Sequence, residues 1–211
     1  MRILAVDTSA EEASAACLED GVVLSSAEAD SSRRHAETVL PMIGSALRQA
    51  GWTLEDVDAF AVDIGPGSFT GVRIGVSVIN AIAFVQEKPV LGVSSLKAVA
   101  EKHRSRSCPA LAILDAGNGN AYAAVYRAGA TETAPCPCTM QEALNLAEEP
   151  RILCGDAAQP SEIPTAQDIG KAAFRDPDSV GEMAVPLYLR PSQAERLFSE
   201  RNRKKRDSDG Q

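Results

Sequence analysis

A pattern of strand, aspartate, short turn and second strand occurs twice in this chain of 211 residues. The two copies share an offset of 108 residues, and three parts match: residues 3–7 with 111–115, residues 13–17 with 121–125, and Gly21 with Gly129. A repeat of this size indicates a duplicated domain. Chance similarity between two hairpins is the alternative, but the matched aspartates and the shared offset favour duplication.

Hydrophobic periodicity and turn residues predict alternating strands and helices in the first copy. The expected strands are residues 2–6, 13–18, 22–29, 58–64 and 90–93, and the expected helices are residues 34–50, 69–84 and 95–101. Pro41 should either kink the first helix or mark the start of its regular turns.

The second copy is shorter and less regular. Its expected elements after the hairpin are a loop at 129–137, a helix at 139–147, a strand at 151–154 and an extended piece at 185–189. We therefore expect an α/β protein with two subdomains of mixed sheet plus helices. They should cover residues 1–104 and 105–198, and residues 199–211 should form a disordered basic tail because they carry too little apolar area to order themselves.

The charge of the chain limits its partners. A net charge of -8 and a pI near 4.9 disfavour unaided binding to nucleic acid, because an acidic chain repels phosphate. Six basic residues between Arg196 and Arg206 reverse the sign locally. We expect this stretch to touch nucleic acid only within a complex, and a purely solubilising tail is the alternative.

Cysteine, histidine and hydropathy patterns point to a cytoplasmic protein with no metal and no membrane contact. The five cysteines are odd in number and irregularly spaced, which favours free thiols in a reducing compartment. The two histidines, His35 and His103, lie in unrelated segments and predict no metal site. The N-terminus lacks a signal-peptide pattern, and no stretch approaches the about eighteen apolar residues of a membrane span.

The most conspicuous motif is the glycine-rich run at residues 65–71, Gly-Pro-Gly-Ser-Phe-Thr-Gly. It lies between a strand and a helix, where backbone N–H groups can hold a phosphate. However, it lacks the lysine of a P-loop, and its glycine spacing differs from the dinucleotide-binding fingerprint. A tight turn that allows close packing is the favoured interpretation.

The helix that follows this motif is apolar on two faces. One stripe holds Val72, Val76, Ile79 and Ala83, and the other holds Ile74, Val78, Ile82 and Val85. One sheet buries only one face of a helix, so the second face predicts a further domain or chain. A wholly internal helix is the alternative. Gly71 and Gly75, one turn apart, should let a neighbouring helix come close.

Asp7 and Asp115 end the first strand of each copy, where an actin-like ATPase places its phosphate loops. Thr8 and Ser9 follow Asp7, although a phosphate loop normally has glycine beside its aspartate. Residues 117–119, Gly-Asn-Gly, are flexible enough but equally typical of a hairpin turn. We interpret Asp7, Thr8, Ser9 and Asp115 as vestigial nucleotide loops.

Five segments together resemble one family. They are residues 3–9 (ILAVDTS), 35–41 (with His-Ala-Glu and Leu-Pro), 65–75 (GPGSFTGVRIG), 92–96 (GVSSL) and 186–190 (PLYLR). The chain is identified on these segments as a member of the TsaB family, also called YeaZ. The run at 65–75 is the most specific, and the match spans nearly the whole chain.

The resemblance implies a duplicated actin-like ATPase (ribonuclease H-like) fold and a non-catalytic role in forming threonylcarbamoyladenosine in tRNA. In the family the protein pairs with its catalytic paralogue TsaD, is joined by the ATPase TsaE, and forms homodimers through helices of the first domain. No catalytic residue, metal or cofactor follows for this chain. The chain departs from the family pattern in two places. Residues 115–118 are Asp-Ala-Gly-Asn, where the family usually has a charged Asp-Ala-Arg-type stretch, and the second domain is trimmed.

The expected partner interface lies on helices 34–50 and 69–84, with Val76 at its centre. Its predicted residues are His35, Glu37, Val39, Met42, Phe69, Val72, Arg73, Val76, Ile79 and Asn80. The alternative function is an actin-fold ATPase or kinase with its own weak nucleotide site. A peptidase has no nucleophile motif or metal ligands to support it.

Overall fold

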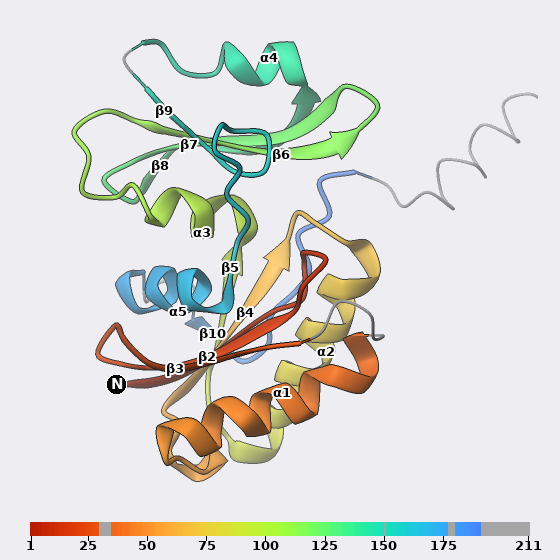
Figure 1. The fold of residues 1–211 in the computed structure, drawn as a ribbon, viewed down its shortest axis with the longest axis vertical. Coiled ribbons are helices and arrows are strands. Elements are labelled where there is room, and N and C mark those ends of the chain that lie inside the picture. Colours follow the sequence, from red (N-terminus) through yellow and green to blue (C-terminus); the bar gives the residue numbers. More distant parts are fainter. Residues whose placement is uncertain (30–34, 150, 177–179, 191–211) are drawn as a thin grey trace, which may run out of the picture.

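The computed structural model describes residues 1–29, 35–149, 151–176 and 180–190. Within them the chain forms two mixed sheets, one above the other in Figure 1, and helices cover both. This confirms the expected α/β class.

The first sheet and its helices comprise β1 (Arg2–Asp7), β2 (Ser14–Glu19), β3 (Val22–Glu28), α1 (His35–Ala50), a 3-10 turn (Leu54–Asp56), β4 (Ala59–Gly65), α2 (Phe69–Gln86), β5 (Val90–Ser94), α5 (Ala166–Arg175) and β10 (Val180–Gly181). The second comprises α3 (Ser95–Glu101), β6 (Ala110–Gly117), β7 (Asn120–Arg127), β8 (Ala130–Thr139), α4 (Met140–Leu144) and β9 (Ile152–Cys154).

The first sheet has helices on both faces. Its described strands lie in the order β10-β5-β4-β1-β2-β3. Alternate residues of β1 point to opposite faces, as the two-residue period of a strand requires. Leu4 and Val6 join the core under α1 and α2, whereas Ile3 and Ala5 join the core under α5. All four side chains are fully buried, so β1 is apolar on both faces.

The second sheet repeats the first in reduced form. Its described strands lie in the order β8-β7-β6-β9, and β6 pairs antiparallel with β7 and parallel with β9. β1 has the same relations to β2 and β4. Both meanders turn between β2 and β3, or β7 and β8, through two residues with positive φ: Asp20-Gly21 and Ala128-Gly129.

The strand register refines the repeat. Asp7 pairs with Ser14 in the first copy, and Asp115 pairs with Ala121 in the second. The second copy therefore has one residue fewer between these paired positions, and one residue more from there to the glycine of the next turn. The two differences cancel, which is why the offset of 108 residues holds at both ends of the hairpin.

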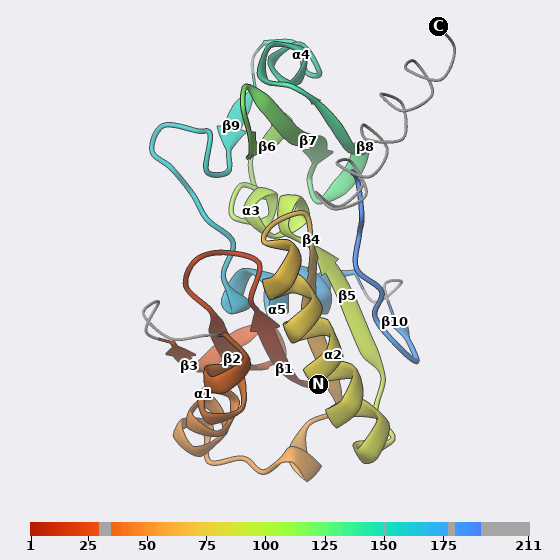
Figure 2. The ribbon, with the colours of Figure 1, turned by 90° about the vertical axis from the view of Figure 1, so that its right-hand side faces the viewer.

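The chain crosses between the sheets more than once. After β9 it returns, and α5 packs on β1 and β2 while β10 pairs with β5. Figure 2 shows β10 beside β5. Further on, Leu187 N donates to Ile64 O at 2.7 Å in the first subdomain. The two sheets therefore do not divide the chain at residues 105–198 as expected. Within that range α5 packs on the first sheet and β10 is one of its strands. The basic tail at 199–211 lies outside the described residues.

Two segments that contain proline were predicted from the sequence, and the structure shows what each of them forms. Residues 130–139 form β8, although a loop was expected over 129–137. β8 lies at the edge of its sheet, where Pro135 and Pro137 can sit without the N–H that an inner strand needs. Pro41 lies inside α1, which continues from His35 to Ala50.

Candidate functional site

The loop after β1 is buried and held by the chain itself. Asp7 and Thr8 are fully buried, and Ser9 is nearly so. Thr8 Oγ1 donates to Gly71 O at 2.7 Å, and Ser68 N donates to Ser9 O at 2.7 Å. One side-chain hydroxyl and one backbone carbonyl of this loop therefore form hydrogen bonds with the start of α2.

Three glycines of the glycine-rich run and α2 make this packing possible. A Cβ atom at Gly67 would lie 2.7 Å from Ser9 O, and one at Gly71 would lie 1.9 Å from Thr8 O. A Cβ atom at Gly75 would lie 2.3 Å from Thr8 Oγ1. The motif thus serves close packing, as the sequence indicates. The expected role of Gly71 and Gly75 in contacting another helix is wrong, because their close neighbour is the β1 loop of the same chain.

The start of α2 has its own cap. Ser68 Oγ accepts a hydrogen bond from Gly71 N at 3.2 Å, so a side chain takes the place that an anion takes at other helix N-termini. Together with the three glycines, this cap fills the space between the β1 loop and α2. We call this arrangement of Thr8, Ser9, Gly67, Gly71 and Gly75 the loop plug.

Asp7, Asp63 and Asp115 each close a turn at a strand end. Asp7 Oδ1 accepts from Ser9 N at 2.8 Å, Asp63 Oδ1 accepts from Gly65 N at 2.6 Å, and Asp115 Oδ1 accepts from Gly117 N at 2.8 Å. Each bond spans two residues, as in an Asx turn. Asp115 is exposed, and its N–H donates to Asp156 Oδ1 at 2.7 Å.

Asp7 and Asp63 form a buried carboxyl pair. Asp63 accepts hydrogen bonds from Ser9 Oγ at 2.9 Å and Ser95 Oγ at 2.7 Å, besides the one from Gly65 N. Asp7 Oδ2 is buried and has no hydrogen-bond partner among the described residues. The side chains that act on the Asp7 carboxyl are those of Asp63 and Ser9. Burial and the charge of Asp63 raise the pKa of Asp7 well above its usual range, and burial also raises the pKa of Asp63. Asp7 therefore holds the proton of the pair, and Asp63 carries the charge that its three donors stabilise.

Asp7→Asn should raise the stability near pH 7.5 above that of the parent. In the unfolded chain Asp7 titrates near 3.8, and in the folded chain its pKa is higher. The parent therefore has its full stability below about pH 4 and loses part of it as the pH rises through the raised pKa. An asparagine keeps the bond from Ser9 N and donates to Asp63 at every pH, so this decline should shrink. Urea unfolding between pH 4 and pH 8 measures it.

The control is Asp63→Asn, which would turn an amide N–H toward existing donors and should destabilise the fold. Equal pH profiles for the parent and Asp7→Asn would contradict the assignment of the proton.

The predicted interface residues separate into two groups. Val39, Met42, Val72, Val76 and Ile79 lie in the core under α1 and α2. The choice of Val76 as the centre of an interface is corrected, because this side chain is 4% exposed and packs against the sheet. Of the other predicted residues, Glu37, Phe69 and Arg73 are exposed, and Asn80 is half-buried. The side chain of His35 lies outside the described part of the chain.

The second stripe of α2 faces outward. Ile74, Val78 and Ile82 are half-buried, and Val85 is 74% exposed. Beside them runs an apolar groove of about 340 Å³ between α1 and α2, lined by Leu40, Leu54, Val78, Ala81, Ile82, Val85 and Gln86. The two-faced pattern thus describes the helix correctly, but the outer face is the stripe that contains Val78.

α2 also qualifies by length and composition as a membrane span, with a mean hydropathy of 1.4 over 18 residues. The expectation that no stretch approaches this limit is therefore wrong. The inner stripe of α2 packs on β4 and its first turns pack on the β1 loop. These contacts are those of a core helix with one uncovered face.

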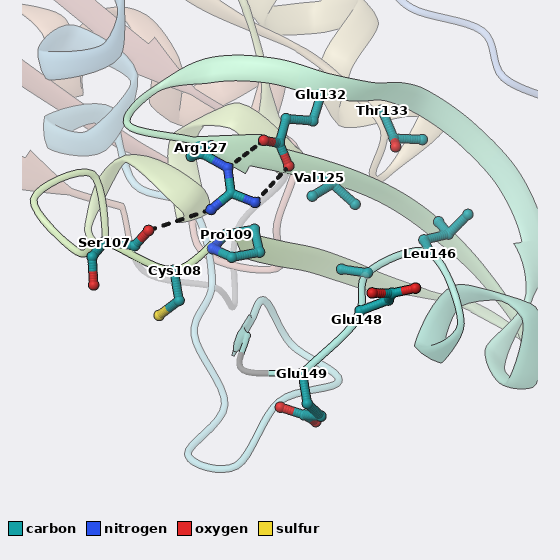
Figure 3. Close-up of a pocket in the computed structure, with 11 residues that line it drawn as sticks. Ser107, Cys108, Pro109, Val125, Arg127, Glu132, Thr133, Leu146, Glu148 and Glu149 are labelled. Atoms are coloured by element: carbon teal, nitrogen blue, oxygen red, sulfur yellow. Dashed lines mark hydrogen bonds and ion pairs between the residues drawn. The ribbon is translucent and has the colours of Figure 1, made fainter.

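Further side chains form local contacts away from α2. His103 Nε2 lies 3.0 Å from Glu162 Oε1, and no group of three metal-ligating side chains occurs in the described ranges. All five cysteines are free thiols. Figure 3 shows a pocket of about 450 Å³ on the second subdomain, where Glu132 pairs with Arg127 and Ser107 O accepts from Arg127 Nη1 at 3.3 Å. None of the predicted site residues lines it.

Comparison with known proteins gives the family. A family model described as "TsaD: tRNA N6-adenosine threonylcarbamoyltransferase" matches residues 23–176. The "tRNA threonylcarbamoyladenosine biosynthesis protein TsaB" of Escherichia coli (strain K12) is 40% identical over 129 residues, which is 60% of this chain and 55% of that protein. This chain belongs to the TsaB/YeaZ family. It spans about half the length of the curated relatives that it matches.

Two further similarities support the fold and the wider kinship of this TsaB-family chain. "YeaZ from Pseudomonas aeruginosa" has a TM-score of 0.70 and 29% identity, over 89% of this chain and 99% of that structure. The "tRNA N6-adenosine threonylcarbamoyltransferase" of Geobacter sulfurreducens is 38% identical over 114 residues, which is 46% of this chain and 34% of that protein. The chain is thus similar to both kinds of protein.

Proposed function

We propose that this TsaB-family chain is a non-catalytic subunit of the assembly that forms threonylcarbamoyladenosine in tRNA, paired with a TsaD-like catalytic chain. The loop plug is the observation that carries the proposal. An actin-fold enzyme needs open backbone amides after its first strand to hold phosphate. Here Thr8 and Ser9 are packed against Gly67, Gly71 and Gly75.

The outer face of α2 supports a partner role. Val85 of α2 is 74% exposed, Phe84 of the same helix is 82% exposed, and Leu40 of α1, across the groove, is 58% exposed. Covering them stabilises an association by removing apolar area from water. A TsaD-like paralogue and a second copy of this chain would offer similar helices, so the two should compete for this surface.

The remaining partners follow from the family. A TsaE-like ATPase would join the pair, and tRNA would be bound only through the complex because the net charge is -8. We assign no cofactor to this chain. Five free thiols fit a reducing compartment, so we place the assembly in the cytoplasm.

The purified chain should hydrolyse no ATP above a buffer blank and should not modify tRNA by itself. Adding it to TsaD-like and TsaE-like proteins and a source of threonylcarbamoyl-adenylate should give modified tRNA, and omitting it should return the yield to background. The readouts are released phosphate and mass spectrometry of digested tRNA.

The competing function, an actin-fold ATPase or kinase with its own nucleotide site, predicts the opposite result in the first assay. ATP turnover by the chain alone, lost in the well-folded variant Asp7→Asn, would overturn the non-catalytic role. Asp115→Asn serves as a second variant, because this exposed residue lies at the equivalent strand end of the other copy.

A further inference from the structure

An exposed stack of three side chains stands at the first turns of α2. The Cζ atom of Arg73 lies 3.8 Å from the centre of the Phe69 ring and 5.4 Å from that of Tyr188. The two rings are 5.4 Å apart, and Arg73 Nε donates to Tyr188 Oη at 2.7 Å. Phe69 is 39% exposed and Tyr188 is 50% exposed, so the stack lies on the surface.

Tyr188 belongs to an extended segment, residues 184–190, that runs along α2 in the opposite direction. Asn80 bonds to both backbone groups of Ala184, at 2.9 Å each, and Arg190 Nη2 donates to Asn120 Oδ1 at 3.2 Å in the second subdomain. We call this segment the strap. Because both ends of the strap are held, the hydroxyl of Tyr188 is fixed in position beside Arg73.

The stack leaves the guanidinium of Arg73 ready to bind an acid. Nε is used by Tyr188, and Nη1 and Nη2 carry four further N–H donors in a planar fork. No carboxylate of the described residues forms an ion pair with Arg73, although the chain has eight more acidic than basic residues. An arginine held by aromatic rings loses little conformational entropy when it binds.

We propose that Arg73 is the docking point for a carboxylate of the partner chain that covers α2, and that Tyr188 is a positioning residue which orients its guanidinium. This inference rests on the proposed function, because it names the chemistry of that partner. The fork matches a carboxylate in two parallel hydrogen bonds. A protein partner fits better than RNA, because the net charge of -8 repels phosphate. The apolar stripe of Val78 and Ile82 lies on the same helix, about a third to a half of a turn round from Arg73.

The test measures association of the full chain with the TsaD-like paralogue from the same organism, by sedimentation and calorimetry at 50 mM and 500 mM NaCl. Arg73→Gln should weaken binding about 30-fold at low salt and remove most of the salt dependence. Arg73→Lys should weaken it about 10-fold, because an ammonium cannot form the bidentate contact. Tyr188→Phe keeps the ring but loses the hydroxyl, and its effect should lie between those of the parent and Arg73→Gln.

Arg106→Gln is the matched control, because it removes the same charge from an exposed site in the link between the subdomains. If Arg73→Gln binds with the affinity and salt dependence of Arg106→Gln, the docking role is wrong. A lower melting temperature without a change in affinity would show that Arg73 only anchors the strap, which also overturns the proposal. Val78→Glu distinguishes failure of the proposed interface from failure of the Arg73 role. If Arg73→Gln and Val78→Glu both leave binding unchanged, the proposed interface is wrong. If Arg73→Gln leaves binding unchanged but Val78→Glu abolishes it, only the role of Arg73 is wrong.

Discussion

Gly71→Ala should destabilise the folded chain by about 3 kcal/mol or more. The new Cβ would lie 1.9 Å from Thr8 O, and the clash is with backbone on a fully buried loop. Relief requires α2 to move away from β1, which opens the core around Val72 and Val76. The free energy of unfolding, measured in urea by circular dichroism, reports the loss.

Gly44→Ala is the matched control in the neighbouring helix. A Cβ at Gly44 would meet only the Nη1 atom of Arg48, at 3.3 Å, on a flexible side chain. Alanine is the better helix former, so this variant should gain about 0.5–1 kcal/mol. The same substitution should therefore have opposite signs at the two glycines, and a stable Gly71→Ala would show that the loop plug is not tightly packed.

Val78→Glu should weaken association with a second copy or a TsaD-like chain about 100-fold or more. Val78 lines the apolar groove on the outer face of α2, where a partner would bury the carboxylate without a counter-charge. Because Val78 is half-buried in the single chain, folding is checked first by circular dichroism. Sedimentation velocity of the variant, alone and with the paralogue, measures association.

Two further variants make this result specific. Val85→Glu changes a side chain that is 74% exposed, so it should fold normally and still weaken association. Thr131→Glu adds the same charge on exposed β8 and should leave association intact. Association of both α2 variants at parental strength would place the partner surface elsewhere on the molecule.

The sequence predicts the fold well where short-range patterns decide it. The matched Asp7 and Asp115, and the two turns at Gly21 and Gly129, are sufficient to indicate duplication because each copy builds its hairpin from local signals. The failure over α5 has a different origin. No helix was predicted over residues 166–175, and nothing local says which of two sheets such a helix would cover. Its packing on the first sheet therefore appears only in three dimensions.

The candidate site was predicted only in part for a related reason. Periodicity shows that α2 has two apolar stripes, and it does not show which stripe faces the sheet, so Val76 was taken for a surface residue. Asp63 was missed because a lone aspartate before a glycine carries no motif. Its position two residues before Gly65, at a buried strand end like that of Asp7, is the one signal that could have found it. Tyr188 lies 115 residues from Arg73, and no spacing rule connects them.

The composition of the loop plug limits how this chain can evolve. The plug consists of backbone atoms, two short hydroxyl side chains and three residues that have no side chain at all. An enzyme inactivated by a bulky side chain regains its pocket when that side chain is shortened. Here the nearest neighbours of Gly67 and Gly71 are backbone oxygens, which no substitution removes. Reopening a phosphate site would require a whole helix to shift while the core beneath it is rebuilt, and single substitutions do not offer a stable intermediate. On the proposed non-catalytic role, a loss of nucleotide chemistry by this route would therefore be hard to reverse.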